Sequence, residues 1–179
     1  MFHPDTQALI DQWTALSRQP GVRAGVPERS AFAPDGLGLR LPRAFMAERI
    51  GDDAVLRLAG SWIESFHGGA LADRSLLSLW RTASRPLVAA AVIQTIREAR
   101  PVVVSALAGA LSAPIEITFA PFRGPSGQPD RILGLYAPTA TLSFVSEDPR
   151  LLTARVSIGV GAVGRAALSL ATVGGRRVA

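Results

Sequence analysis

The feature that most constrains the fold is a long amphipathic segment that stops at a proline and leads directly into a β-branched stretch. Residues 85–99 place apolar side chains at helical spacing, which predicts a helix with one broad buried face. Ser84 is suited to cap this helix, and Pro86 is tolerated in a first turn that has no hydrogen bond to lose. Pro101 then ends the helix, and the apolar, β-branched residues 102–107 predict a strand.

Four further stretches predict strands. Residues 115–119 alternate apolar and polar side chains, so one face of this strand is buried and the other is wet. Residues 46–50 and 54–59 flank a turn rich in Asp and Gly, which is typical of a hairpin. Residues 132–136, with an extension over 140–145, form the last strand. The sequence thus predicts a sheet of five strands.

Two short helical segments lie between the hairpin and the long helix. One begins after Gly60 and carries Trp62, Ile63 and Phe66, and the other covers residues 71–80. Antiparallel strands with helices inserted after the second strand predict an α+β fold, with the short helices and the long helix on one face of the sheet.

An amphipathic helix is expected before this domain, over residues 5–18 within an N-terminal unit 1–20. Leu9, Trp13 and Leu16 fall on one helical stripe and must be buried against the chain's own core or a second copy. Asp5 or Thr6 can cap the helix. A linker rich in Gly, Pro and Arg follows over residues 21–38.

The positive charge is confined to one end of the chain. The net charge is +5, and residues 1–148 contain as many acidic residues as Arg, so the excess comes from the Arg residues after Asp148. Residues 147–179 are rich in Arg, Gly and Ala, and we expect a poorly ordered tail because Gly loses much backbone entropy on ordering. These cations are scattered and have no aromatic residues among them, which argues against nucleic acid as a partner.

Several kinds of chemistry are excluded by residue type. The chain has no Cys and no Lys, so thiolate metal sites, disulfides, Schiff bases and Walker-type phosphate loops are ruled out. The G-x-G-x-x-G pattern at residues 159–164 lacks the later acidic residue that would hold a ribose. His3 is expected to be a loose terminal residue and His67 a turn or surface residue, with a haem or metal ligand as the alternative for His67. We expect no metal site and no enzyme.

The element order and four short motifs resemble a known family. The motifs are Leu-Pro-Arg-Ala-Phe (41–45), Leu-Arg-Leu-Ala-Gly-Ser (56–61), the break at Gly68, and the segment 76–80 that ends in Leu-Trp. They are similar to those of a bacterial family of small stand-alone PAS-domain proteins, and the likeness covers residues 39–146. The chain departs from the pattern at residues 67–73, where an apolar residue and an Arg-Glu-Leu-like run are usual.

The resemblance implies a sensory module that binds a small ligand or a protein and commonly dimerises through an N-terminal helix. Leu9, Trp13 and Leu16 are the candidate dimer or partner residues. The candidate pocket beneath the sheet consists of Trp62, Phe66, His67, Trp80, Arg81 and Phe119. Arg81 can pair with an anionic ligand through its forked guanidinium. The alternative is that the aromatic residues only fill the core.

The function expected from these observations is a PAS-type regulatory module that acts in trans on a partner protein, as a homodimer and under the control of a small ligand. Two alternatives remain open: a ligand-free interaction protein with a filled core, and a nucleic-acid binder that uses the Arg-containing tail. The longest charge-free runs are too short for a membrane span, and the N-terminus has no signal-peptide pattern, so we expect a cytoplasmic protein. Neither the ligand nor any cofactor is identified by the sequence.

Overall fold

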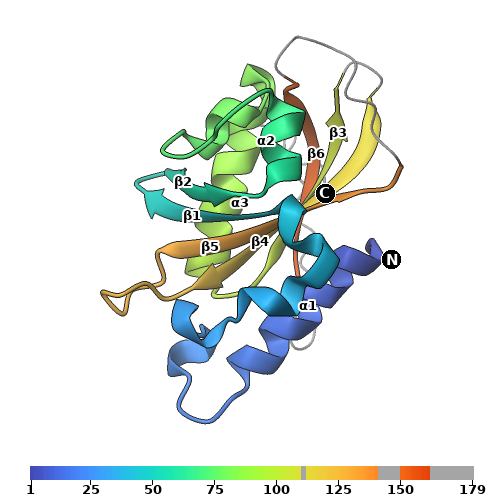
Figure 1. Ribbon diagram of the computed structural model, residues 1–179. Coiled ribbons are helices and arrows are strands. Elements are labelled where there is room, and N and C mark those ends of the chain that lie inside the picture. The colour runs from blue at the N-terminus through green and yellow to red at the C-terminus, as the bar shows by residue number, and fades with distance from the viewer. Residues whose placement is uncertain (110–111, 141–149, 162–179) are drawn as a thin grey trace, which may run out of the picture.

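A computed structural model describes residues 1–109, 112–140 and 150–161 of the chain. Its centre is a six-stranded sheet in the order β2-β1-β5-β4-β3-β6, in which every neighbouring pair is antiparallel (Figure 1). The strands are β1 (Ala44–Ile50), β2 (Asp53–Ala59), β3 (Val102–Ala108), β4 (Ala113–Phe122), β5 (Arg131–Pro138) and β6 (Leu152–Gly159).

The helices precede the sheet or connect its second and third strands. The α-helices are α1 (Pro4–Ser17), α2 (Ser61–His67) and α3 (Arg85–Arg97). The 3-10 helices are η1 (Arg23–Gly25), η2 (Arg29–Ala31), η3 (Pro34–Arg43), η4 (Leu76–Leu79) and η5 (Thr82–Ser84). The helix expected over residues 71–80 is therefore reduced to one 3-10 turn, η4.

The two faces of the sheet bury separate apolar clusters. Along β4, Ile117 and Phe119 belong to the cluster beneath α2 and α3, whereas Ala120 and Phe122 belong to the cluster beneath α1. This follows from the period of two in a strand, which points successive side chains to opposite faces. Figure 1 shows α1 and α3 on opposite sides of the sheet. The predicted α+β fold with an antiparallel sheet is confirmed, with α2 and α3 on one face and α1 on the other.

The sheet has one strand more than predicted. β6 lies within the segment that we expected to be a poorly ordered tail, and that expectation is wrong for residues 152–159. This strand pairs with β3 over its whole length, with a bulge between Ser105 and Ala106. Its partner is distant in sequence, so local composition carried no sign of the pairing. The predicted strand extension over 140–145 falls outside the described residues from 141 onwards.

Ser84 joins α3 to this sixth strand. Its hydroxyl makes no cap bond at the start of α3 and instead accepts a hydrogen bond from the backbone N–H of Ala154 at 3.0 Å. The backbone N–H of Arg81 also donates to the carbonyl of Leu152 at 2.9 Å. The side chain of Ser84 thus binds β6 and does not cap α3 as predicted.

The N-terminal helix packs on its own sheet. We call the face covered by α1 the outer face and the face covered by α2 and α3 the inner face. Leu9 and Trp13 are buried in the cluster on the outer face, and the indole Nε1 of Trp13 donates to the carbonyl of Pro121 at 2.7 Å. Leu16 is partly buried at the edge of the same cluster. Leu9 and Trp13 therefore cannot contact a dimer partner while α1 is docked. Of the two ways to bury this stripe, the structure has the chain's own core.

The segment predicted as a linker, residues 21–38, is folded against the domain. It forms η1, η2 and the start of η3, and it buries Val26, Phe32 and Leu37. His3, expected to be loose, accepts a hydrogen bond from the N–H of Asp5 through Nδ1 at 3.1 Å and so caps α1. Residues 21–43, with η1, η2 and η3, thus cover the outer face of the sheet, and we call this segment the 3-10 layer.

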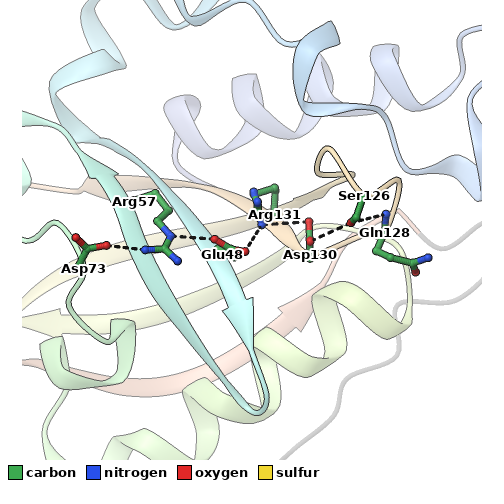
Figure 2. A network of polar contacts seen from close by, with 7 residues as sticks. All are labelled: Glu48, Arg57, Asp73, Ser126, Gln128, Asp130 and Arg131. Carbon is green, nitrogen blue, oxygen red and sulfur yellow. Dashed lines mark hydrogen bonds and ion pairs between the residues drawn. The ribbon is translucent and has the colours of Figure 1, made fainter.

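A chain of ion pairs crosses the strands at the β2 edge (Figure 2). Arg57 donates from Nε to Glu48 at 2.9 Å and from Nη1 to Asp73 at 2.6 Å, and Nη1 of Arg131 lies 3.0 Å from Glu48. The hydrogen bond from Arg57, together with the charge of Arg131, lowers the pKa of Glu48. Exposed pairs of this kind contribute little stability, so the relative positions of β2, β1 and β5 are set mainly by their backbone ladders.

Candidate functional site

The candidate site is an aromatic cluster between α2 and the inner face of the sheet. Trp62 and Phe66 stand one helical turn apart on α2, and their rings stack at 5.5 Å between centroids with an interplanar angle of 2°. Gly68 ends α2 in the left-handed conformation at φ 85°, which favours glycine. This stop leaves His67 as the last residue of the helix, with its side chain turned into the core.

A buried polar pair lies inside this cluster. Nε2 of His67 is 3.1 Å from the hydroxyl oxygen of Tyr136, and both side chains are buried. Tyr136 comes from the inner face of β5 and also contacts Phe45 and Trp62, at 6.0 and 6.2 Å between ring centroids. The pair links the end of α2 to the centre of the sheet.

The surroundings keep both partners neutral. Burial lowers the pKa of His67 to about 4, against the opposing effect of a hydrogen bond with the Arg150 backbone, and the charges of Arg74 and Arg150 lower it further. Burial raises the pKa of the Tyr136 hydroxyl above its usual range. At pH 7 the hydrogen bond therefore joins two uncharged groups, and the histidine tautomer sets which of them donates.

The structure brings together only part of the predicted pocket. Trp62, Phe66 and His67 form one group, and Phe119 reaches it through Phe45, at 6.2 Å between ring centroids. The expectation that His67 is a turn or surface residue was wrong. A short helix that stops at Gly68 can turn its last side chain inward, whereas a His beside two glycines suggested a loop.

Two predicted residues lie elsewhere. Trp80 is fully buried where η4 meets β6, and its Nε1 has no hydrogen-bond partner within the described part of the chain. Arg81 is exposed, so its predicted place in the pocket is wrong. Its backbone is held by Leu152 of the unpredicted strand β6, which fixes the chain direction at this point.

Sequence reasoning missed two members of the cluster. Phe45 was named only as part of the motif 41–45 and Tyr136 only as part of the strand 132–136, and neither was assigned to the pocket. A signal for Tyr136 was present, because a tyrosine on the buried face of an alternating strand needs a polar partner for its hydroxyl. The partner it has is His67.

The guanidinium of Arg150 packs against Phe66 of the aromatic cluster. Its guanidinium carbon lies 5.7 Å from the centroid of the Phe66 ring, and Nη1 donates to the Phe66 carbonyl at 3.4 Å. Arg150 was counted among the cations of the basic tail. Its place against Phe66 takes it away from the scattered Arg residues that a nucleic-acid binder would use.

The family is decided by comparison with known sequences. A family model described as a PAS domain matches residues 1–137, which include α1, the 3-10 layer and the strands as far as β5. The chain belongs to the PAS domain family. No curated protein matches it. A PAS domain is in general a sensory or regulatory module, and this is the general role of the chain.

Two further properties concern the described residues only. No three His, Asp or Glu side chains among residues 1–109, 112–140 and 150–161 come together as metal ligands would. None of the helices within those ranges is both long and apolar enough to cross a bilayer.

Proposed function

We propose that this PAS domain regulates a partner protein in trans, and that a small ligand at the aromatic cluster controls the contact. The observation that carries the proposal is the His67–Tyr136 hydrogen bond, a neutral polar pair buried among aromatic rings. Apolar walls with a few fixed polar groups are typical of small-molecule sites. The proposal includes no catalytic step.

The ligand class follows from the groups that surround the pair. The aromatic surroundings of the pair, Trp62 and Phe66, favour an apolar aromatic body, and a neutral His67 offers a hydrogen-bonding nitrogen. A ligand with an aromatic ring and one hydroxyl would replace the Tyr136 hydroxyl as the partner of His67. The predicted pairing of an anionic head with Arg81 is not part of this proposal, because Arg81 is exposed.

The route from ligand to partner runs along α2. This helix has seven residues and is followed by Gly68 and Gly69, both at positive φ. A Cβ at Gly60, just before α2, would collide with the carbonyl of Pro42, so the start of α2 sits directly against η3. Loss of the His67–Tyr136 bond would free the end of α2, and a shift of α2 would reach η3 and the surface. Such a response is a population shift between two arrangements of the helices.

The test uses phenol as the probe and backbone NMR as the readout. We expect saturable shifts at Trp62, His67 and Tyr136, and faster amide exchange over residues 61–69. His67→Phe removes the nitrogen and should abolish the response, whereas Arg97→Gln on the exposed side of α3 should leave it unchanged. Shifts that are absent, or that persist in His67→Phe, would favour the alternative of a ligand-free interaction protein with a filled core.

A further inference from the structure

A cavity lies on the other side of β1 from the aromatic cluster, under the 3-10 helices η2 and η3. It has a volume of about 230 Å³ and opens between η2, η3 and the first two strands. Phe45 is the residue that it shares with the aromatic cluster. Its lining includes Arg29, Phe32, Leu37, Leu41, Leu58 and Leu133.

The cavity has a buried floor and an exposed apolar rim. Phe32, Leu37 and Leu133 belong to the core cluster beneath α1 and are almost fully buried. At the mouth, Leu41 is 47% exposed and Leu58 is 66% exposed. Large apolar side chains gathered in this way around a concave site mark a binding surface rather than a random exposure.

The charge at the mouth is of one sign. Among the described residues that line the cavity, Arg29 is the charged one and none is acidic. Its Nη1 donates to the carbonyl of Phe32 at 3.3 Å, which holds the half-buried guanidinium beside the opening. A guanidinium has five N–H donors in a planar fork, so donors remain for a carboxylate.

The volume limits the size of the ligand. An apolar cavity of roughly 150 Å³ holds benzene, which has six carbons, and by the same proportion a cavity of 230 Å³ holds a chain of roughly nine carbons. The apolar lining fits an alkyl chain and the lone cation fits an anionic head.

We propose that this cavity binds a free medium-chain aliphatic carboxylate. The alkyl chain fills the space between Leu37 and Leu133 and is closed in by Leu41 and Leu58, and the carboxylate pairs with Arg29. The site is distinct from the aromatic cluster although the two share Phe45, because its floor belongs to the other core and its polar group is Arg29.

The roof of the site is fixed to the N-terminal helix. Nε of Arg40 and Nη2 of Arg43, both on η3, lie 2.7 and 2.9 Å from the carboxylate oxygens of Asp5 on α1. Filling the cavity therefore stabilises the contact between η3 and α1, and we expect octanoate to slow amide exchange over residues 34–43.

The experiment is a calorimetric titration of the full chain with sodium octanoate below its micelle concentration. Wild type should bind saturably at one site. Leu58→Asp and, separately, Leu41→Asp place a carboxylate at the rim on exposed positions and should abolish binding without unfolding the protein. Arg29→Gln should weaken binding roughly tenfold, as expected for the loss of one charge-assisted contact, and 1-octanol should bind wild type with a similar deficit.

Matched controls keep these results specific. Ile50→Asp makes the same change at an exposed apolar residue on the far end of β1, and Arg97→Gln removes a cation from the opposite face. Both should bind octanoate like wild type. The proposal is overturned if wild type shows no saturable binding, or if Ile50→Asp and Leu58→Asp lose binding equally.

Two other occupants would also overturn it. If sedimentation shows a dimer that Leu58→Asp dissociates and octanoate does not, the cavity belongs to a contact between copies of the chain. If octanoate fails to bind and vesicles of anionic phospholipid retain wild type but not Leu58→Asp, the rim is a membrane contact. The phenol response of the aromatic cluster is measured separately, so failure at one site leaves the other tested on its own.

Discussion

Nε2 of His67, the last residue of α2, lies 3.1 Å from the hydroxyl oxygen of Tyr136 in the middle of the sheet. The bond is buried and joins two neutral groups, because burial disfavours the charged form of each. It is a polar link between the short helix and the sheet. Its strength should therefore set how firmly α2 is docked.

The free energy of unfolding should fall as the pH drops from about 6.5 to about 4. The pKa of His67 is 6.5 when unfolded and about 4 when folded, so the unfolded chain binds more protons in this range. A difference of this size corresponds to roughly 3 kcal/mol lost by the lower end. Urea unfolding at pH 7.5 and pH 4.5 measures it. His67→Phe should remove most of the difference, and an unchanged pH dependence in that variant would show that His67 is not its source.

Tyr136→Phe should destabilise the fold by about 1–3 kcal/mol, because it leaves the buried nitrogen of His67 without a partner. Removing both partners should cost less than the sum of the single changes. A double-mutant cycle with His67→Phe, followed by urea unfolding, gives this coupling. Strictly additive losses would mean that the hydrogen bond contributes nothing.

Gly134→Ala should destabilise the sheet by roughly 1–3 kcal/mol, the usual range for overpacking a core. The Phe45 ring lies over Gly134, in the space that an added Cβ would take. Thermal unfolding of Gly134→Ala alone and combined with Phe45→Leu checks this. The combined variant should recover part of the loss, and a larger loss in the combination would place the strain elsewhere.

Asp5→Asn should loosen the contact between η3 and α1. Burial disfavours the Asp5 charge, but hydrogen bonds from Arg40 and Arg43 and their charges outweigh it and lower the pKa of Asp5. Amide exchange over residues 34–43 should speed up several-fold in Asp5→Asn. Asp11→Asn, which alters an exposed Asp on the same helix, should leave those amides unchanged.

Ending the chain after Pro149 should unfold or strongly destabilise the domain, because it removes β6 and exposes the buried strand β3. Thermal unfolding of the shortened chain measures the effect. A melting temperature equal to that of the full chain would restore the reading of this segment as a dispensable tail.

Local patterns were enough to predict most of the framework. The long helix, the hairpin and the strands at 102–107 and 115–119 follow from periodicity and from Pro101, which act within a few residues. β6 could not be predicted in this way, since its stability comes from pairing with β3 and from Ser84. The folding of the 3-10 layer could not be predicted for the same reason. Phe32 and Leu37 are isolated apolar residues in the sequence, and their burial depends on the outer face of the sheet.

Only part of the candidate site could be predicted from the sequence. Trp62 and Phe66 share a helical face, so their spacing places them together. The inward turn of His67 depends on the helix stop at Gly68, and its partner Tyr136 is far away in sequence. Arg81 was misplaced because the chain direction after Trp80 is set by β6.

The most direct test of the central claim is native mass spectrometry of the protein purified from cells, repeated after denaturation. A ligand-controlled PAS domain should carry a mass excess that disappears on denaturation, with at least one bound species that is lost in His67→Phe and retained in Leu58→Asp. A bare mass in wild type, together with no response to phenol, would contradict the account and leave a domain whose aromatic residues only fill its core.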